Sequence, residues 1–239
     1  MKSTKNDKYS RSKSEAKSSK KQHEKQYRNK AQEVCQPVEG ITDGKCELIN
    51  AIKTSTVVFI TGYPGTGKTF ISTALTADSL MQGEINKVIC TRPIVSCGND
   101  IGILPGDVDE KFAPYMQPIM DVFNQRIGKS AVECLVKNKQ IQQIPLQLMR
   151  GASFDNAVIL ADEMENATAE QLEMLLTRIG KNCTLIINGD IKQKDIPNSG
   201  LQYAINKTCR INGISHVQMG IDDIVRSGIV KDIVKAFWS

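Results

Sequence analysis

Hydrophobic residues gather in short continuous runs from about residue 40 onward, and mixed stretches separate these runs. Four of the runs are apolar and rich in β-branched residues, and they lie at 56–61, 87–91, 157–161 and 184–188. Continuous apolar runs of this length are typical of strands that are buried on both faces. Between the last two runs, apolar residues recur at Leu172, Leu175, Leu176 and Ile179. Their spacing predicts a helix over 169–179.

The alternation of strand-like and helix-like segments indicates the α/β class, with a parallel sheet covered by helices on both faces. Polar residues follow each apolar run, at the sheet edge where open α/β sheets bind ligands. The stretch from Ser96 to Ile144 interrupts the alternation and contains Pro105, Pro114 and Pro118. We expect this stretch to be irregular and to pack on an edge of the sheet as an insertion.

The run at 56–61 leads into GYPGTGKT, which fits the phosphate-binding P-loop pattern G-x-x-x-x-G-K-[ST]. A strand before the pattern and a helix after it supply the required context. Glycines let backbone N–H groups turn toward phosphate oxygens, and the helix start adds a favourable dipole. The alternative is a chance glycine-rich turn. The predicted nucleotide-binding residues are Gly62, Tyr63, Pro64, Gly65, Thr66, Gly67, Lys68 and Thr69.

Two residues of different segments are predicted to hold Mg²⁺. Thr69 would hold the ion by its hydroxyl, as P-loop Ser or Thr residues do. Asp162 directly follows the run at 157–161, which is the Walker B position for a magnesium-binding Asp. The alternative for Asp162 and the next residue is an acid pair at a helix start, stabilised by the helix dipole.

Three further residues are predicted to act in hydrolysis of a nucleoside triphosphate. Lys68 would reach the β- and γ-phosphates. Glu163 is placed to orient or deprotonate the attacking water. Gln193 follows the run at 184–188 within Gly189-Asp190-Ile191-Lys192-Gln193, and a Gln there can hydrogen-bond the γ-phosphate and the water. The alternative for Gln193 is an ordinary polar turn after a strand.

Basic residues gather at the N-terminus. Residues 1–33 contain eleven Lys or Arg and four acidic residues, whereas the rest of the chain contains 20 basic and 22 acidic residues. The overall charge of +5 therefore describes an appendage rather than the whole chain. We predict a basic, disordered tail at 1–36 and one domain at 37–239. The tail either binds nucleic-acid phosphates by counterion release or only adds solubility.

The sequence also favours a cytoplasmic location. No apolar run approaches the ~18 residues that a membrane helix needs, and the start of the chain has no apolar signal-peptide region. The seven cysteines are scattered without a C-x-x-C pair, which argues against a zinc site or a disulfide scaffold and for a reducing compartment.

Taken together, these segments resemble the PhoH family of phosphate-starvation-inducible P-loop ATPases, from about Gly44 to Ile233. Beyond the P-loop, the resemblance depends on several short motifs in order along the chain. They are Thr91-Arg92-Pro93, Leu104-Pro105-Gly106-Asp107, Met149-Arg150-Gly151, Asp162-Glu163, Leu176-Thr177-Arg178, Gly189-Asp190 with Gln193, Ser199-Gly200-Leu201 and Asp223-Ile224-Val225-Arg226. The resemblance implies a single RecA-like domain related to superfamily 1 helicases, ATP hydrolysis, a role on RNA, and ring-shaped hexamers.

The resemblance also assigns roles to single residues. Gln193 would belong to helicase motif III, a γ-phosphate sensor, and Arg92 to motif Ia, which touches the nucleic-acid backbone. Arg226 falls where helicases place an arginine finger, which neutralises charge on the transferring phosphoryl group. Arg178 and Arg150 are competing candidates for that role, and each of the three could equally be a surface or ion-pairing residue.

The sequence departs from the family pattern at two positions. Lys45 stands where relatives use a Gln to read adenine, and lysine cannot reproduce the paired donor and acceptor of an amide. This leaves ATP and GTP both open as substrates. Glu165 stands in a segment where relatives more often show Ala-Gln-Asn, and an extra acid there would weaken nucleotide or nucleic-acid contacts.

Three functions fit these observations. The first is an ATP-driven helicase or translocase on single-stranded nucleic acid, RNA more than DNA. The second is a nucleotide-dependent switch with a protein partner and no unwinding activity. The third is a small-molecule kinase, which Glu163 and Gln193 disfavour because kinases avoid positioning water. A monomeric helicase needs two RecA-like lobes and this chain supplies one, so we expect a head-to-tail homo-oligomeric ring that supplies an arginine in trans.

Overall fold

The computed structural model describes residues 37–94, 108–193, 195–225 and 228–238. The predicted tail at 1–36 and the arginine-finger candidate Arg226 lie outside the described residues. Within that part of the chain, the strands form one sheet in which every pairing is parallel, in the order β3-β2-β4-β5-β1-β6. The strands are β1 Val57–Gly62, β2 Lys87–Thr91, β3 Ile141–Gln143, β4 Ala157–Ala161, β5 Cys183–Gly189 and β6 Ile214–Met219.

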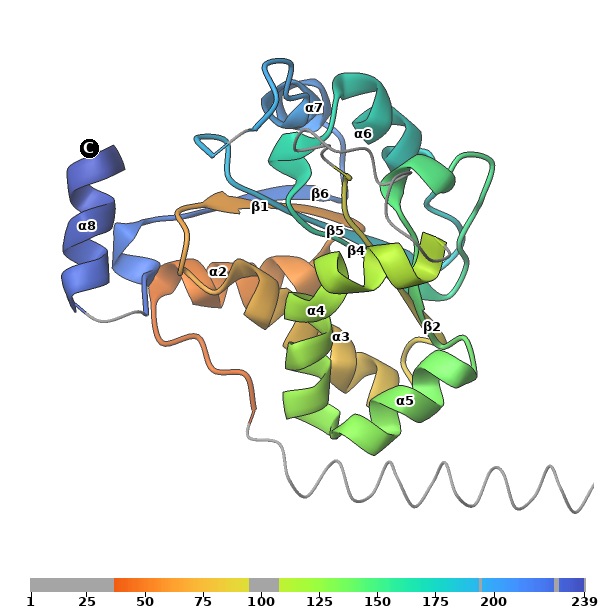
Figure 1. Ribbon diagram of the computed structural model, residues 1–239. Helices are drawn as coiled ribbons and strands as arrows, with labels where there is room; N and C mark the ends of the chain where they lie inside the picture. The colour runs from red at the N-terminus through yellow and green to blue at the C-terminus, as the bar shows by residue number, and fades with distance from the viewer. Residues whose placement is uncertain (1–36, 95–107, 194, 226–227, 239) are drawn as a thin grey trace, which may run out of the picture.

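Helices cover both faces of this sheet (Figure 1). One face carries α2 Asp43–Thr54, α3 Lys68–Gln82, α4 Val108–Ile127 and α5 Lys129–Lys137, and the other carries α6 Ala169–Leu176 and α7 Leu201–Thr208. The last helix, α8 Gly228–Trp238, stands at the side of these layers and contacts the short helix η4 Ile221–Asp223. The α/β class with a parallel sheet covered by helices on both faces, expected from the sequence, is therefore confirmed.

The central strands form because their side chains have an apolar partner on each face. Along β1, Val58 and Ile60 pack in the core under α2 and α3, while Val57 and Phe59 pack in the core under α7. All four side chains are at most 3% exposed. Burial of each such side chain contributes about 1.5–3 kcal/mol, which is why these runs form strands without any polar alternation.

The strand order determines where the site lies. β5 pairs with β1 on one side and with β4 on the other, all in parallel. The carboxyl ends of these three strands therefore meet at one edge of the sheet. The P-loop follows β1, Asp162 and Glu163 follow β4, and Asp190 follows β5. Three segments that are far apart in the sequence are thus brought to one place.

The expectation of an irregular insertion over 96–144 is wrong for its described part, although that part does pack at the sheet edge. Residues 108–127 form the long helix α4 with Pro114 and Pro118 inside it, and α5 and β3 follow. A proline interrupts a helix because it lacks an N–H and crowds the preceding turn. Here the apolar stripe Phe112, Met116, Ile119 and Phe123, each at most 2% exposed, outweighs that cost.

The helix predicted over 169–179 forms but ends at Leu176. Its start is fixed by a capping box, in which Thr168 accepts from the Gln171 backbone N–H and the Gln171 side chain accepts from the Thr168 N–H. Ile179 instead makes an isolated parallel bridge to Phe154. In the described ranges, no helix has both the length and the apolar character to cross a membrane.

Candidate functional site

The loop after β1 adopts backbone angles that favour glycine. Gly62, Gly65 and Gly67 have φ values of 141°, 81° and 92°. A Cβ atom at Gly62 would lie 2.3 Å from the carbonyl oxygen of Met219, so no larger residue fits there. The Thr66 hydroxyl donates to the Tyr63 carbonyl at 2.9 Å and closes the loop on itself. α3 begins directly after Gly67, so the helix start faces the loop interior.

Lys68 points into this loop. Its ammonium donates to the backbone carbonyls of Gly62 and Tyr63, the latter at 3.0 Å. Burial lowers the pKa of Lys68, and the carboxylates of Asp190, Glu165, Asp162 and Glu163 oppose that effect. A lysine held at a helix start among carboxylates is placed to bind an anionic phosphate.

Thr69 and Asp162 lie side by side. The Thr69 hydroxyl donates to Asp162 Oδ1 at 2.9 Å. Burial raises the pKa of Asp162, the neighbouring Glu163 adds to the rise, and the Thr69 hydrogen bond opposes it. The two oxygens are hard ligands, and their separation is about that of adjacent ligands in an octahedron with bonds of about 2.1 Å. The residues present therefore fit Mg²⁺ as the sequence predicts.

Glu163 has an unusual backbone and a specific partner. Its φ and ψ are 53° and 39°, in the left-handed region that non-glycine residues rarely adopt. Its Oε1 atom forms an ion pair with the Arg92 guanidinium at 3.1 Å. Arg92 also donates to the Tyr115 carbonyl at 3.1 Å. The expected nucleic-acid contact, Arg92, thus lies against the expected catalytic base, a pairing that the sequence does not reveal.

Glu165 is a structural acid beneath the site rather than an exposed one. It is 2% exposed, and its Oε2 atom accepts from the Asp190 backbone N–H at 3.1 Å. Burial and the neighbouring Glu163 carboxylate raise the pKa of Glu165 to about 9. Glu165 therefore faces the Asp190 backbone rather than solvent, and the expectation that it weakens nucleotide or nucleic-acid contacts stays a prediction.

Asp190 and Gln193 complete the site from the end of β5. Asp190 Oδ1 accepts from the Lys192 backbone N–H at 2.9 Å, whereas its buried Oδ2 atom has no hydrogen-bond partner among the described residues. Gln193 is exposed, and its backbone N–H donates to the Asp190 carbonyl at 3.0 Å. Sequence reasoning did not assign a role to Asp190, although its position after an apolar run is the same signal that identified Asp162.

These residues line one cavity of about 300 Å³. Its wall contains the P-loop, the end of β4 and the end of β5, with Pro64, Gly65, Gly67, Lys68, Thr69, Phe70, Asp162, Glu163, Glu165, Gly189, Asp190 and Gln193. The structure therefore brings together Lys68, Thr69, Asp162, Glu163 and Gln193, which the sequence predicts to act on a nucleotide. We refer to this space as the phosphate cavity.

The other arginine candidates lie elsewhere. Arg178 donates to the carbonyls of Met174 and Ala152, both at 3.0 Å, and to the Thr177 hydroxyl at 2.9 Å. Its guanidinium thus ties the end of α6 to the loop before β4. Arg150 is exposed and does not line the phosphate cavity.

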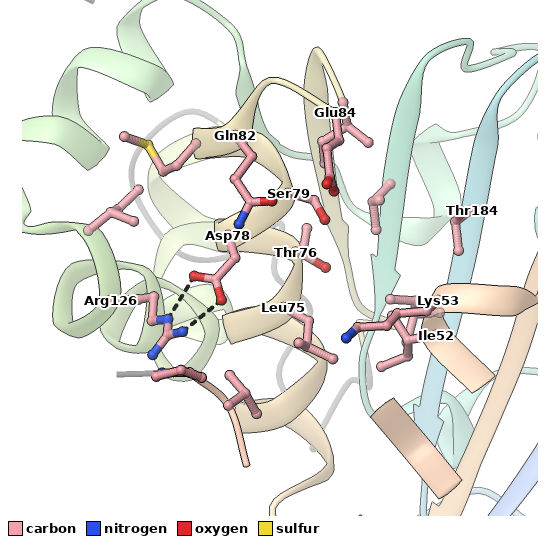
Figure 2. Close-up of a pocket in the computed structure, with 17 residues that line it drawn as sticks. Ile52, Lys53, Leu75, Thr76, Asp78, Ser79, Gln82, Glu84, Arg126 and Thr184 are labelled. Carbon is pink, nitrogen blue, oxygen red and sulfur yellow. Dashed lines mark hydrogen bonds and ion pairs between the residues drawn. The ribbon is translucent and has the colours of Figure 1, made fainter. Parts of the chain in front are cut away.

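A larger cavity of about 690 Å³ lies between α2 and α3, near the amino ends of β4 and β5. Figure 2 shows Asp78 and Arg126 facing one another at its wall, with Lys53 on the opposite side. The Arg126 guanidinium donates to both carboxylate oxygens of Asp78, at 2.8 and 2.6 Å. None of the residues lining this cavity lines the phosphate cavity.

Comparisons with known proteins agree with this geometry. The family model described as "PhoH-like protein" matches residues 37–238. The chain is similar to Protein PhoH of Escherichia coli strain K12, with 37% identity over 206 residues, which cover 84% of this chain and 58% of that protein. It is also similar to the PhoH-like protein of Bacillus subtilis strain 168, with 38% identity over 199 residues, which cover 82% of this chain and 62% of that protein. The chain therefore spans less than two thirds of the length of these relatives.

Among solved structures, the chain is similar to the flagellar accessory protein FlaH from Methanocaldococcus jannaschii. The similarity covers 83% of this chain and 75% of that chain, with 12% identity and a TM-score of 0.29.

Proposed function

The chain belongs to the PhoH family, and from this premise we propose that it binds ATP with Mg²⁺ and hydrolyses the γ-phosphate. The observation that carries the proposal is the convergence of Lys68, Thr69, Asp162, Glu163 and Gln193 on one cavity of about 300 Å³. A lysine, a hydroxyl, two carboxylates and an amide are the groups that ATP hydrolysis at a P-loop requires.

Each side chain has a defined part in this proposal. Lys68 turns from the Gly62 and Tyr63 carbonyls toward the β- and γ-phosphates and offsets their charge. Thr69 and Asp162 would hold Mg²⁺, which would supply positive charge to neutralise the charge that develops on the phosphates. Gln193 hydrogen-bonds the γ-phosphate and the attacking water.

Glu163 takes the proton of that water. The water oxygen forms a bond to the γ-phosphorus while the bond from that phosphorus to the bridging oxygen breaks. The products are ADP and inorganic phosphate, and the proton leaves the carboxylate to solvent. The exposure of the Glu163 side chain, 41%, permits this exchange with water.

We propose that hydrolysis acts on single-stranded nucleic acid, RNA more than DNA, as a helicase or translocase. The family resemblance and the basic N-terminal residues support this target. Arg92 is the candidate contact to the phosphate backbone. A homo-oligomeric ring, expected as a hexamer, would supply Arg226 or another arginine from a neighbouring copy, because one RecA-like lobe provides one wall of the site.

A nucleotide-dependent switch is the second candidate, and one observation favours it. The ion pair between Arg92 and Glu163 occupies an oxygen of the proposed base. Hydrolysis would then wait for a partner that withdraws Arg92, and that partner could be a protein as well as a nucleic acid.

The test is steady-state ATP hydrolysis with Mg²⁺, with and without single-stranded RNA or DNA. Lys68→Ala and Glu163→Gln serve as matched controls for contaminating activity. Stimulation by RNA that both variants lose supports the nucleic-acid motor, and duplex unwinding is then measured. Hydrolysis that no nucleic acid changes supports the switch. Full hydrolysis by a species that stays monomeric with ATP, shown by light scattering, contradicts the ring.

A further inference from the structure

A second cavity lies directly beside the phosphate cavity and shares Gly67 and Phe70 with it. Its volume is about 460 Å³. Its wall is largely apolar and is built by Pro37, Val38, Ile41, Phe70, Ile71 and Val225, with a few polar residues. A nucleotide with its phosphates at Lys68 would extend past Gly67 into this space. An apolar cavity with a few placed polar groups suits a planar, largely apolar group such as a nucleobase.

Lys45 is the buried polar residue of this wall. It lies in the first turn of α2 and is 4% exposed. Its backbone N–H donates to Thr42 Oγ1 at 3.4 Å, but among the described residues its ammonium forms no hydrogen bond or ion pair. The residue as a whole is buried and lines the cavity, so its ammonium donors remain available to a group that enters this space.

The position of Lys45 is fixed by its neighbours. The Thr42 hydroxyl donates to Asp223, and a second oxygen of Asp223 accepts from the Gly220 backbone N–H at 2.7 Å. A Cβ atom at Gly44 would lie 2.5 Å from Asp223 Oδ2, so η4 packs closely against the start of α2. This contact holds the first turn of α2 beside the cavity.

The other polar residues of the wall are engaged or exposed. Thr66 donates to the Tyr63 carbonyl, and Arg126 pairs with Asp78 through two hydrogen bonds. Glu39 is exposed to solvent. Within the described part of the wall, Lys45 is therefore the cationic side chain whose donors remain available to a ligand.

The chemistry of an ammonium group separates the purines. It has three N–H donors and no acceptor. Guanine presents two adjacent acceptors, O6 and N7, whereas adenine presents N7 beside the N6 amino group, which is a donor. An ammonium can therefore donate to a carbonyl oxygen at C6, but it cannot accept from an amino group there. A glutamine amide has both a donor and an acceptor, so it can pair with either group.

We propose that this cavity is the base subsite of the nucleotide and that Lys45 selects a purine with an oxygen at C6. GTP and ITP are then substrates with higher kcat/KM than ATP. The inference rests on the proposed function, because it requires the triphosphate to occupy the phosphate cavity.

The first experiment compares kcat/KM of the unmodified chain for ATP, ITP, GTP and the triphosphate of 2,6-diaminopurine riboside. ITP differs from ATP at C6 and N1, so that pair isolates the atom that Lys45 reads. A hydrogen bond to a charged group leads us to expect a ratio of ITP to ATP on the order of tenfold. The diaminopurine nucleotide, which keeps the C6 amino group, should resemble ATP. An ATP value equal to or above that of ITP overturns the base assignment.

The second experiment changes the lysine. Lys45→Gln and Lys45→Met should each remove the preference for ITP, and Lys45→Gln should also raise kcat/KM for ATP. Lys53→Met, on the same helix but facing the larger cavity, should keep the full ratio. A ratio that stays unchanged in the Lys45 variants overturns the proposal.

Inorganic tripolyphosphate distinguishes the contribution of the phosphates to binding from the contribution of the base. It competes at the phosphate cavity and carries no base, so its inhibition constant should be the same in the unmodified chain and in the folded Lys45 variants. Failure of every nucleotide and of tripolyphosphate to bind would overturn the proposed function and the base assignment with it. Binding and hydrolysis of nucleotides without preference for ITP would overturn the base assignment alone.

Discussion

Of two cavities in this fold, the larger has paired charges, and the smaller contains the groups expected to act on a nucleotide. The cavity between α2 and α3 is about 690 Å³ (Figure 2), and its facing charges, Asp78 and Arg126, neutralise each other. The phosphate cavity is about 300 Å³ and contains Lys68, several carboxylates and a buried oxygen of Asp190 that has no hydrogen-bond partner in the described part of the chain. Charge that the fold brings together and leaves unsatisfied, rather than volume, marks the chemical site.

The largest effect is expected when the cation of the phosphate cavity is removed, because this tests whether the charges of that cavity are needed for hydrolysis. Lys68→Met should lower kcat for ATP hydrolysis by about 10²–10³-fold, because a preorganised group that stabilises developing charge contributes on that scale. Burial lowers the pKa of Lys68, so the folded state disfavours its charge, and the variant should unfold at the same temperature or a higher one. Phosphate-release kinetics and a thermal melt test both statements. If Lys68→Met lowered the melting temperature enough to unfold the chain under the assay conditions, the loss of kcat would reflect a structural role of Lys68.

The next largest effect should come from the ion pair at the edge of the same cavity. Arg92→Met frees Oε1 of Glu163, so basal hydrolysis should rise by on the order of tenfold and its stimulation by nucleic acid should fall. Arg92→Lys keeps a positive charge without the guanidinium geometry, so its basal rate should lie between those of the unmodified chain and Arg92→Met. Steady-state rates with and without single-stranded RNA provide the measurement. A fall in basal hydrolysis would instead mean that Arg92 holds Glu163 in its active position.

The acid beneath the cavity predicts a pH effect on stability. The pKa of Glu165 is about 9 in the folded state, above its ordinary value of 4.5, so the folded chain holds this proton more tightly than the unfolded chain does. Its contribution to the free energy of unfolding is complete below pH 4.5 and is lost as pH rises through 9. Glu165→Gln cannot ionise and should therefore gain stability relative to the unmodified chain as pH rises. Urea unfolding at pH 6 and pH 9 measures the difference, and a difference independent of pH would contradict the prediction.

The smallest effect should come from the larger cavity. Asp78→Asn removes one charge of a partly buried ion pair and should lower the free energy of unfolding by about 1–2 kcal/mol. Because Asp78 lines neither the phosphate cavity nor the proposed base cavity, kcat at saturating nucleotide should stay within about twofold of the unmodified value, whereas KM can respond because its partner Arg126 lines the base cavity. Chemical denaturation and hydrolysis assays on the same preparation test the contrast. A strong loss of hydrolysis with intact stability would show that the two cavities are coupled.

The sequence predicted the centre of the sheet better than its edges. The four predicted strands are continuous apolar runs because both of their faces are covered. β3 has three residues, and β6 alternates buried Val217 with exposed His216 and Gln218, so neither produces such a run. α4 was missed because its prolines are local signals, whereas its stability comes from packing against α3, which is distant in sequence.

The same distinction holds for the site. The P-loop and Asp162 could be located because each directly follows an apolar run, and Gln193 because it lies in the short segment after β5; the end of a parallel strand is where ligands bind. The contact of Arg92 with Glu163 joins residues at the ends of β2 and β4. Only the pairing of those two strands brings the side chains together, and no local pattern in the sequence encodes it. The predicted ring, the nucleic-acid target, the cytoplasmic location and the roles of single residues stay predictions.

At Glu163, the residue that the proposed activity needs is not the residue that would be most stable in this left-handed backbone conformation. A side chain in that conformation costs on the order of 1–2 kcal/mol, and glycine would adopt it without strain. A glycine, however, would carry no carboxylate to receive a proton. The chain therefore retains a locally unfavourable geometry where its proposed base stands, and selection for stability alone would remove that residue.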